Sequence, residues 1–339
     1  MKAILLKEPG GPEQLYLGET KKPIPSSHEV LIKVKATALN RADTLQRMGK
    51  YPPPFGASSI IGLEVSGIIE AVGEQVKEWK VGDKVCALLA GGGYAEFVTV
   101  HSQCLISIPN VFDFEKAAAI PEVFLTAFQA LFYLSKLQKG ESILIHAGAS
   151  GVGTAAIQLA KSLGAKQIIV TASAGKHQIC QDLGADVTID YKTQNFEEVV
   201  AKITEGKGVD VIIDFLAAPY FQKNINSLNF DGRMVMLALM GGWKVEELIL
   251  ANILRKRLHI MGSTLRARTI EYKIGLINDF SDYALKRFTK GELQPVIDSI
   301  FDWSDVADAH RLMESNKNSG KIILKLSLIH ISEPTRLRR

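Results

Sequence analysis

Short apolar runs and helical stretches alternate through the middle of this 339-residue chain. Residues 142–147 form an apolar run of strand length, and the glycine-rich stretch 148–153 follows directly. Across 152–163, apolar side chains recur at i, i+3, i+4, i+7, i+8 and i+11, which is the spacing of one helix face. Gly164 ends this helix, and another apolar run lies at 167–171. The pattern predicts a strand, a glycine turn, a helix and a second strand.

The same alternation continues as far as residue 263. The predicted strands lie near residues 142–147, 167–171, 186–190, 209–215, 232–239 and 258–263. The predicted helices lie near residues 152–163, 176–183, 196–204, 219–228 and 246–256. Strands and helices in this order are typical of an α/β fold with a doubly wound parallel sheet. The sequence therefore predicts a six-stranded Rossmann domain.

The N-terminal third has a different pattern. Short strands cut by Gly and Pro turns predict a compact β unit, with strands near residues 30–36, 65–72, 81–89 and 94–100. Residues 117–133 are expected to form a helix, apart from Pro121, that leads into the Rossmann segment. After a helix at 272–289, a segment at 294–301 and a strand at 321–326 are expected to rejoin the β unit. That unit would then be discontinuous in sequence.

These patterns divide the chain into two domains and a tail. We expect a mainly-β domain at 1–119, completed by 290–326, and the Rossmann domain at 120–289. Residues 327–339 follow neither periodicity and look like the translation of a sequencing adapter. We expect this stretch to be a non-native, disordered tail.

Composition narrows the class of protein. The chain is 47% hydrophobic and 22% charged, with a net charge of +4, so neither nucleic acid nor a membrane is expected as its main partner. No apolar run has the length of about 18 residues that a membrane span needs. The three cysteines are scattered, which favours a reducing compartment and a cytoplasmic location.

The glycine-rich turn has the residue types that a dinucleotide site requires. Small residues let the backbone approach a pyrophosphate, whose charge is stabilised at the N–H-rich start of the helix. Ser150 stands where the usual pattern has a glycine, so it either touches the pyrophosphate or replaces a glycine where space permits. A tight turn without a ligand is the alternative. The expected contacts are Gly148, Ser150, Gly151, Val152 and Gly153.

The end of the second strand favours NADPH over NADH. An NAD site places an acid there to bind the ribose hydroxyls, whereas this strand runs into Ser173 and Lys176 with no acid before Asp182. The hydroxyl and the positive charge suit a 2′-phosphate, and Tyr191 offers a ring near the same ribose. The alternative is that Lys176 is an ordinary solvated lysine.

Several ordered motifs show a resemblance to a known family. They lie at residues 38–43 (ALNRAD), 61–67 (IGLEVSG), 91–97 (GGGYAEF), 118–121 (AAIP) and 146–153 (HAGASGVG). From Met1 to Leu326 the chain resembles the zinc-independent quinone oxidoreductase branch of the medium-chain dehydrogenase/reductase superfamily. Within that branch it looks most like the tumour-suppressor-inducible quinone oxidoreductases. The resemblance implies a GroES-like mainly-β catalytic domain beside the Rossmann domain.

The resemblance also implies a metal-free reduction of quinones by NADPH. Zinc-dependent members place a Cys ligand at the position of Asn40 and a His at the position of Leu63, so we expect no metal. Hydride transfer from nicotinamide would take place in the cleft between the domains. Catalytic roles are expected for Tyr51, which could stack on a flat acceptor and donate a proton, and for Asn40, which could bind the ribose or the acceptor oxygen.

Further cofactor contacts come from the same resemblance. They are expected at Thr126, Leu239, Met240, Gly241, Ser263, Thr264, Leu265 and Lys321. Simpler interpretations stay open: Tyr51 as a surface tyrosine, Asn40 as a helix cap, Thr126 as a buried helical residue and Lys321 as a solvated edge lysine. A homodimer or homotetramer joined through the last Rossmann strand is also implied.

Other functions remain in competition. An enone or trans-2-enoyl-thioester reductase would use the same fold, and the thioester would need a basic patch for its phosphates, for which residues 255–257 or Arg266 and Arg268 are candidates. A crystallin-like or RNA-binding protein is the non-enzyme alternative. The near-neutral charge argues against RNA binding as the main role.

Overall fold

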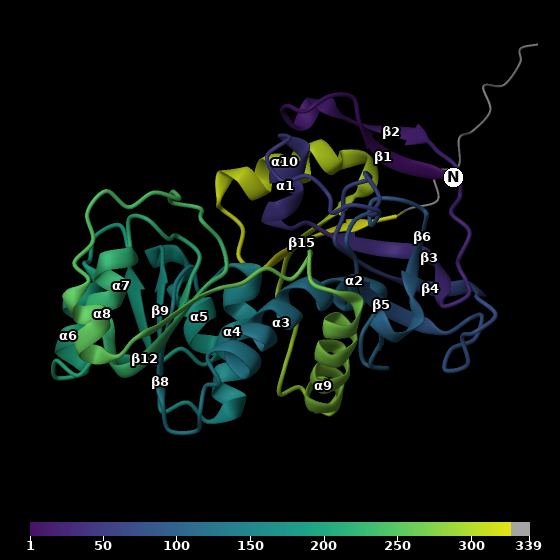
Figure 1. The fold of residues 1–339 in the computed structure, drawn as a ribbon. Coiled ribbons are helices and arrows are strands. Elements are labelled where there is room, and N and C mark those ends of the chain that lie inside the picture. Colours follow the sequence, from purple (N-terminus) through teal and green to yellow (C-terminus); the bar gives the residue numbers. More distant parts are fainter. Residues whose placement is uncertain (327–339) are drawn as a thin grey trace, which may run out of the picture.

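The computed structural model describes residues 1–326, which form two sheets and the helices around them (Figure 1). The expected tail at 327–339 lies outside the described residues. One sheet has six strands and the other has seven, and a two-stranded hairpin of β1 (Lys2–Leu6) and β2 (Leu15–Glu19) lies apart from both. The predicted α/β fold class is confirmed.

The six-stranded sheet is parallel throughout. Its order is β10 (Val187–Asp190), β9 (Gln167–Ala172), β8 (Ser142–Ile145), β11 (Val209–Asp214), β12 (Leu228–Met236) and β13 (His259–Gly262). The connecting helices are α4 (Gly151–Leu163), α5 (His177–Leu183), α6 (Phe196–Ile203), α7 (Phe221–Ser227) and α8 (Ala251–Lys256). The central strand β8 is buried along its whole length, as expected for an apolar strand covered on both faces. This strand order is that of a doubly wound sheet.

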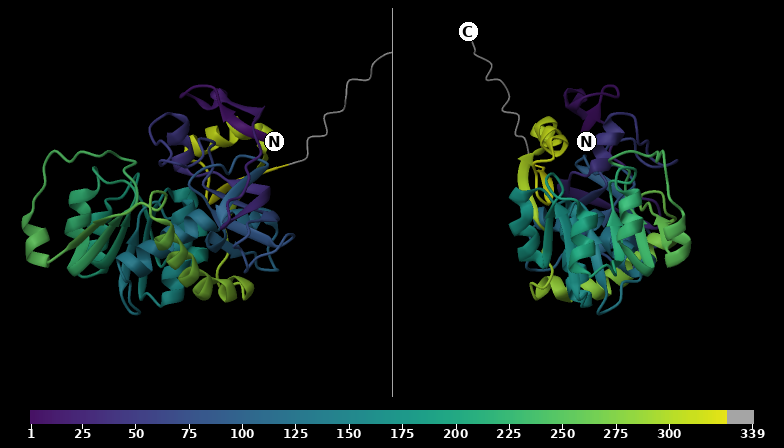
Figure 2. Two further views of the ribbon diagram at one scale, coloured as in Figure 1. Left: turned by 45° about the vertical axis from the view of Figure 1, so that its right-hand side comes forward. Right: turned by 90° about the vertical axis from the view of Figure 1, so that its left-hand side faces the viewer.

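The seven-stranded sheet is mixed and mostly antiparallel. Its order is β14 (Ile297–Asp302), β15 (Lys321–Lys325), β3 (Glu29–Ala38), β4 (Glu64–Val72), β5 (Lys84–Leu88) and β7 (Leu105–Ser107), with β6 (Phe97–His101) also paired to β3. Ile323 of β15 lies opposite Ala38 of β3. The predicted return of the C-terminal segment to the N-terminal sheet is therefore confirmed, and Figure 2 shows the yellow C-terminal elements against the purple and blue N-terminal part.

Some predicted elements differ from the structure. The single helix expected at 117–133 is three pieces, α2 (Phe114–Ala118), α3 (Pro121–Phe128) and a π-helical turn (Gln129–Leu134). Pro121 separates the first two because it has no N–H to donate and its ring crowds the preceding turn. Strand β12 begins at Leu228, four residues earlier than expected. Helix α8 begins at Ala251, whereas the helix was expected from residue 246. Helix α10 (Val306–Ser315), between β14 and β15, was not predicted.

The two sheets share one continuous apolar core. Val30 and Val98 of the mixed sheet belong to the same buried cluster as Ile143 and Val211 of the parallel sheet. Helices α3 and α9 (Ile270–Thr289) join them, as their place between the two halves in Figure 1 shows. The predicted domain boundaries at 119/120 and 289/290 stay predictions. None of the helices within residues 1–326 is both long and apolar enough to cross a membrane.

Candidate functional site

The glycine turn after β8 is packed so closely that side chains would not fit. A Cβ on Gly153 would lie 2.4 Å from the carbonyl oxygen of Ala147, and a Cβ on Gly148 would lie 2.7 Å from the Cβ of Val170. The Oγ of Ser150 accepts a hydrogen bond from the N–H of Gly153 at 3.1 Å and so caps α4. The strand, turn and 13-residue helix have the arrangement of a phosphate-binding turn.

The ribose end of the predicted cofactor site lies at the ends of β9 and β10. These strands are neighbours in register, with Ala172 opposite Asp190, so Ser173 and Tyr191 leave the sheet side by side. Tyr191 is 49% exposed. The ammonium of Lys176 donates hydrogen bonds to the carbonyls of Asn316 and Asn318 at 2.8 and 2.6 Å. The Lys176 ammonium thus has two backbone partners in the segment that precedes β15.

The predicted nicotinamide segments follow β12 and β13 at the same edge of the sheet. Gly241 donates its N–H to the carbonyl of Leu216 at 2.9 Å, and a Cβ there would lie 2.7 Å from that oxygen. Ser263 donates its N–H to the carbonyl oxygen of Met236 at 3.0 Å. The buried Oγ of Ser263 has no hydrogen-bond partner among residues 1–326. Leu239, Met240 and Thr264 are exposed, and Leu265 is buried in the core. An unpartnered hydroxyl fits a site that a polar ligand completes.

Polar groups, all of them buried except the partly exposed Glu122, gather where the mixed sheet meets α3. We call this set the junction cluster: Asn40, Asp43, Glu64, Glu122, Arg266 and Lys321. The carboxylate of Glu64 accepts hydrogen bonds from the Asn40 amide at 2.8 Å, the Lys321 ammonium at 2.7 Å and the Glu122 N–H at 2.8 Å. Lys321 also donates to Asn40 Oδ1 at 2.7 Å and to the carbonyl of Leu39 at 2.6 Å. Glu64 and Lys321 are almost completely buried.

These contacts change the interpretation of two predicted residues. Lys321 is a buried residue with three oxygen partners, so it is neither the solvated edge lysine nor free to contact a cofactor phosphate. The side-chain amide of Asn40 bonds to Lys321 through its oxygen and to Glu64 through its nitrogen. Both ends of the Asn40 amide are thus engaged with charged neighbours, which favours a positioning role, and the predicted contact with a ligand stays a prediction. The aliphatic part of Lys321 lies against the glycine turn, because a Cβ on Gly151 would be 2.9 Å from its Cδ.

Tyr51 lies against a buried arginine. The guanidinium carbon of Arg266 is 5.2 Å from the centre of the Tyr51 ring, and its Nη1 donates to the Tyr51 carbonyl at 3.4 Å. Arg266 also donates to the carbonyl of Ala90 at 2.8 Å and to Gln46 Oε1 at 2.7 Å, all neutral acceptors. The Tyr51 side chain is half-buried, and burial raises the pKa of its phenol. Arg266, which follows β13, thus joins the parallel sheet to the loop that carries Tyr51.

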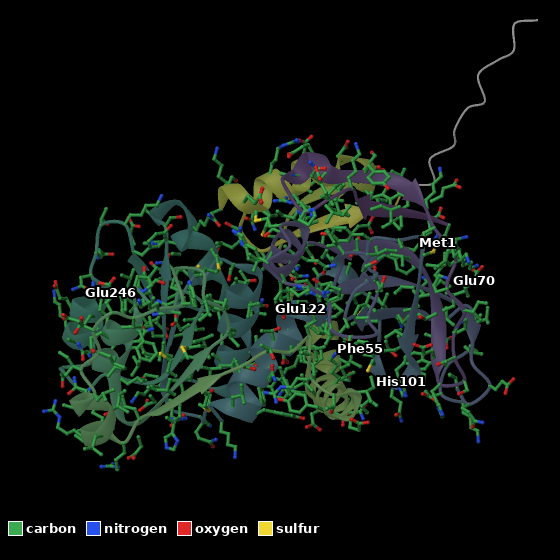
Figure 3. All side chains as sticks on the ribbon, turned by 45° about the horizontal axis from the view of Figure 1, so that its top comes forward. Met1, Phe55, Glu70, His101, Glu122 and Glu246 are labelled. Carbon is green, nitrogen blue, oxygen red and sulfur yellow. The ribbon has the colours of Figure 1, made fainter. Side chains whose placement is uncertain are left out.

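Glu122 opens the first turn of α3 and is labelled in the middle of the molecule in Figure 3. Its Oε2 is buried and has no hydrogen-bond partner among the described residues. Burial and the charge of Glu64 raise the pKa of Glu122 to about 8. Burial likewise raises the pKa of Asp43 to about 7. Thr126 lies one turn beyond Glu122 on the same face of α3 and is partly exposed.

Sequence reasoning missed the contacts of Glu122 and Glu64, and considered Arg266 only as part of a basic patch for a thioester phosphate, not as a partner of Tyr51. A signal for Glu122 was present, since it is the one acidic residue in the apolar stretch 117–128. His146, expected to be structural, is buried and lies between Thr171 at 3.0 Å and Asn224 at 2.7 Å. Burial lowers its pKa.

The side chains at the positions where related enzymes bind zinc do not suit a zinc ion. At the two positions of the usual catalytic ligands, Asn40 bonds to its neighbours through both ends of its amide and Leu63 is a buried apolar residue. Across residues 1–326, no three His, Cys, Asp or Glu side chains come together as a metal-binding group. The carboxylate of Glu64 is paired with Lys321.

Two family descriptions match the chain. Residues 26–110 match "Alcohol dehydrogenase GroES-like domain" and residues 151–290 match "Zinc-binding dehydrogenase". The quinone oxidoreductase of Rattus norvegicus is 34% identical, over 96% of this chain and 98% of the relative. The synaptic vesicle membrane protein VAT-1 homolog of Danio rerio is also 34% identical, over 95% of this chain and 69% of the relative.

Solved structures with this fold include an enoyl reductase and a protein in complex with NADPH. The CurK enoyl reductase has a TM-score of 0.86 and 32% identity, covering 96% of this chain and 99% of that one. A mycobacterial protein complexed with NADPH has a TM-score of 0.86 and 29% identity, covering 96% and 100%.

Proposed function

Because this chain belongs to the medium-chain dehydrogenase/reductase superfamily, in the branch of the quinone oxidoreductases, we propose that it reduces quinones with NADPH and without a metal. The observation that carries the proposal is the pairing of Tyr51 with Arg266. A half-buried phenol lies against a buried guanidinium that has no carboxylate partner within residues 1–326. Such a pair suits a flat acceptor that gains negative charge on an oxygen.

The cofactor would lie along the carboxyl edge of the parallel sheet. Gly148, Ser150, Gly151, Val152 and Gly153 would hold the pyrophosphate at the start of α4. The adenosine end would lie against Ser173, Lys176 and Tyr191, and the nicotinamide against 239–241 and 263–265, near Thr126. The unpartnered Oγ of Ser263 is suited to bind the carboxamide. When bound, NADPH would supply the hydride.

The lysine near the ribose would need to exchange partners. Lys176 would leave the carbonyls of Asn316 and Asn318 and pair with the 2′-phosphate, a charge-assisted contact that NADH does not offer. This exchange is the physical basis of the proposed preference for NADPH.

At the acceptor, Tyr51 would act as a stacking surface and as a hydrogen-bond donor to the developing oxyanion. Arg266 would stabilise that charge and hold the Tyr51 loop in place through its bond to the Tyr51 carbonyl. Asn40 would act as a positioning residue, since both ends of its amide bind Glu64 and Lys321. Lys321 would serve the same structural purpose from β15.

An enone or enoyl-thioester reductase is the second candidate, supported by the similarity to the CurK enoyl reductase. Of the basic residues that a thioester phosphate would need, residues 255–257 already have partners, while Arg266 bonds only to neutral groups beside Tyr51. Lys256 donates to the carbonyls of Asn226 and Leu228, and Arg257 pairs with Asp231 at 2.6 Å. These contacts favour the quinone. We further propose a cytoplasmic homodimer or homotetramer, with a crystallin-like or RNA-binding role as the non-enzyme alternative.

The test is a turnover assay with the purified chain in EDTA. Loss of the near-ultraviolet absorbance of NADPH, and separately of NADH, is followed with ortho- and para-quinones, a simple enone and a trans-2-enoyl thioester. NADPH-specific quinone reduction supports the proposal. Faster turnover of the thioester would assign the chain to acyl reduction, and NADPH binding without turnover of any acceptor would refute the enzyme assignment.

A further inference from the structure

Arg41 is the first residue of helix α1 (Arg41–Arg47), and its guanidinium reaches helix α10, which lies beside α1 in Figure 1. Its Nη2 donates to the carbonyl of Met313 at 2.9 Å and to the Oδ1 of Asn316 at 2.6 Å. Its Nε and Nη1 have no hydrogen-bond partner within residues 1–326, and the side chain is partly exposed. Several N–H groups of this guanidinium are therefore available to a ligand.

Asn316 brings a second cation to the same place. The ammonium of Lys176 donates to the backbone carbonyl of Asn316 at 2.8 Å, while Arg41 donates to the side-chain oxygen of that residue. The two oxygens of one asparagine are at most about 5 Å apart, so the two positive groups lie within about 10 Å of each other. Two long side chains at this distance can both contact one phosphate group, since each hydrogen bond spans about 2.8 Å.

The segment that begins at Asn316 lies along the proposed cofactor site. The carbonyl of Asn318 accepts a second hydrogen bond from Lys176 at 2.6 Å. The N–H of Gly320 donates to the carbonyl of Ala149 in the glycine turn at 2.8 Å. Residues 316–320 thus join the turn proposed for the pyrophosphate to the turn at 174–176 proposed for the ribose. Because Arg41 is bonded to the first residue of this segment, it lies at the ribose end.

Neither cation has an acidic partner. Within residues 1–326, Arg41 and Lys176 form no ion pair, and all of their hydrogen bonds go to neutral oxygens. The acid whose charge acts on Arg41 is Glu314, but its carboxylate pairs with Arg47. The acid whose charge acts on Lys176 is Asp298, which accepts a backbone N–H at 2.7 Å. Two unpaired cations at one place favour an anionic ligand.

We infer that Arg41 is a second binding residue for the 2′-phosphate of NADPH, together with Lys176, an inference that rests on the proposed function for the position of the ribose. The phosphate is a strong acceptor with close to two negative charges, and a guanidinium offers it N–H groups in a fixed fork. Both cations would turn from the neutral oxygens of Asn316 to the phosphate. NADH has a hydroxyl group there, so Arg41 gains no charged partner from it. Arg41 thus adds to the preference for NADPH.

A structural role of Arg41 makes a different prediction. Its bonds to Met313 and Asn316 close the C-terminal end of α10, and a basic side chain at such a position stabilises the helix. Loss of this contact alone would affect the binding of both cofactors equally. Loss of a contact with the 2′-phosphate affects only NADPH. The ratio of the two dissociation constants therefore separates the two roles.

The test measures the binding of NADPH and of NADH by titration calorimetry, without an acceptor. Arg41→Gln should weaken NADPH binding about 10-fold and leave NADH binding unchanged. Arg41→Lys, which keeps the charge, should lose less. The double variant with Lys176→Ala should bind the two cofactors equally. Arg311→Gln is the matched control and should change neither constant, because Arg311 of α10 is exposed and pairs with Asp308 at 2.5 Å.

Inorganic phosphate is the second probe, because a free phosphate has the same chemistry as the 2′-phosphate. It should compete with NADPH and not with NADH in the wild type, and the competition should weaken in Arg41→Gln. Weaker phosphate binding with unchanged NADPH binding would assign Arg41 to free phosphate and overturn the inference.

Equal weakening of both cofactors by Arg41→Gln, or no change in either, would also overturn it. The urea midpoint of each variant checks its fold, and Arg41→Lys decides the question if Arg41→Gln does not fold. A wild type that binds NADPH no more tightly than NADH would refute the preference for NADPH and the role of Arg41 together. Failure of the proposed reduction shows separately, as NADPH-specific binding without turnover of any acceptor, and in that case the calorimetry still decides the role of Arg41.

Discussion

Replacing Lys321 by methionine should destabilise the protein strongly, because it removes one partner of a buried ion pair. The Lys321 ammonium has three oxygen partners at 2.6–2.7 Å, and its side chain is 3% exposed. Methionine keeps the apolar stem that lies against Gly151. The Glu64 carboxylate would remain buried with only the Asn40 amide and the Glu122 N–H as partners.

The expected loss is about 3–5 kcal/mol of unfolding free energy, the usual cost of leaving a buried charge unpaired. With a urea slope of about 3 kcal/mol per M, the unfolding midpoint should fall by about 1–1.7 M. Tryptophan fluorescence reports the transition, since one of the three tryptophans, the buried Trp303, packs in the same cluster as Ile322 and Leu324 of β15.

A matched control lies on the same strand. Lys325 pairs with Glu115 at 2.6 Å, but its side chain is 58% exposed. Lys325→Met should therefore cost no more than about 1 kcal/mol. The double variant Glu64→Gln with Lys321→Met should cost less than the two single changes added together, because the charge and its counter-charge leave together. Additive losses, or a loss below about 1 kcal/mol for Lys321→Met, would refute the reasoning.

Three further predictions concern the cofactor and the fold. Lys176→Ala should weaken NADPH binding about 10- to 100-fold and leave NADH binding unchanged, as titration calorimetry would show; equal weakening of both would contradict the assigned role. Ser150→Ala should lower the unfolding free energy by about 1 kcal/mol through loss of the α4 cap, measured by urea denaturation, and an unchanged midpoint would argue against the cap. Burial and the Arg47 charge lower the pKa of His310 to about 3, so between about pH 6.5 and 3 the unfolded chain binds a proton that the folded chain does not. Wild-type stability is therefore lost as the pH falls through that window. Relative to His310→Asn, the wild type should lose about 1.4 kcal/mol for each unit by which the pH is lowered, and a constant difference would show that His310 titrates normally.

Local pattern was enough to predict the parallel sheet. The apolar run at β8, the glycine turn and the amphipathic helix α4 are each read from neighbouring residues, and they lie where the periodicity indicates. The helix at 117–133 shows the limit of that method, because the periodicity continued through Pro121 while the proline separated α2 from α3. The ends of β12 and α8 also differed, since boundaries depend on contacts beyond the segment.

In the candidate site, too, some features could be predicted from the sequence and others could not. The sequence by itself determined the glycine turn at the start of α4 and the lack of an acid between β9 and Asp182, since both are features of consecutive residues. Only the tertiary structure decided the partners of the charged groups. Lys321 and Glu64 are far apart in sequence and meet because β15 pairs with β3, which pairs with β4. Arg266 reaches Tyr51 for the same reason, and so the Oε2 of Glu122 has no hydrogen-bond partner within residues 1–326. Charge pairing depends on distances across sheets, and periodicity along the chain contains no information about those distances.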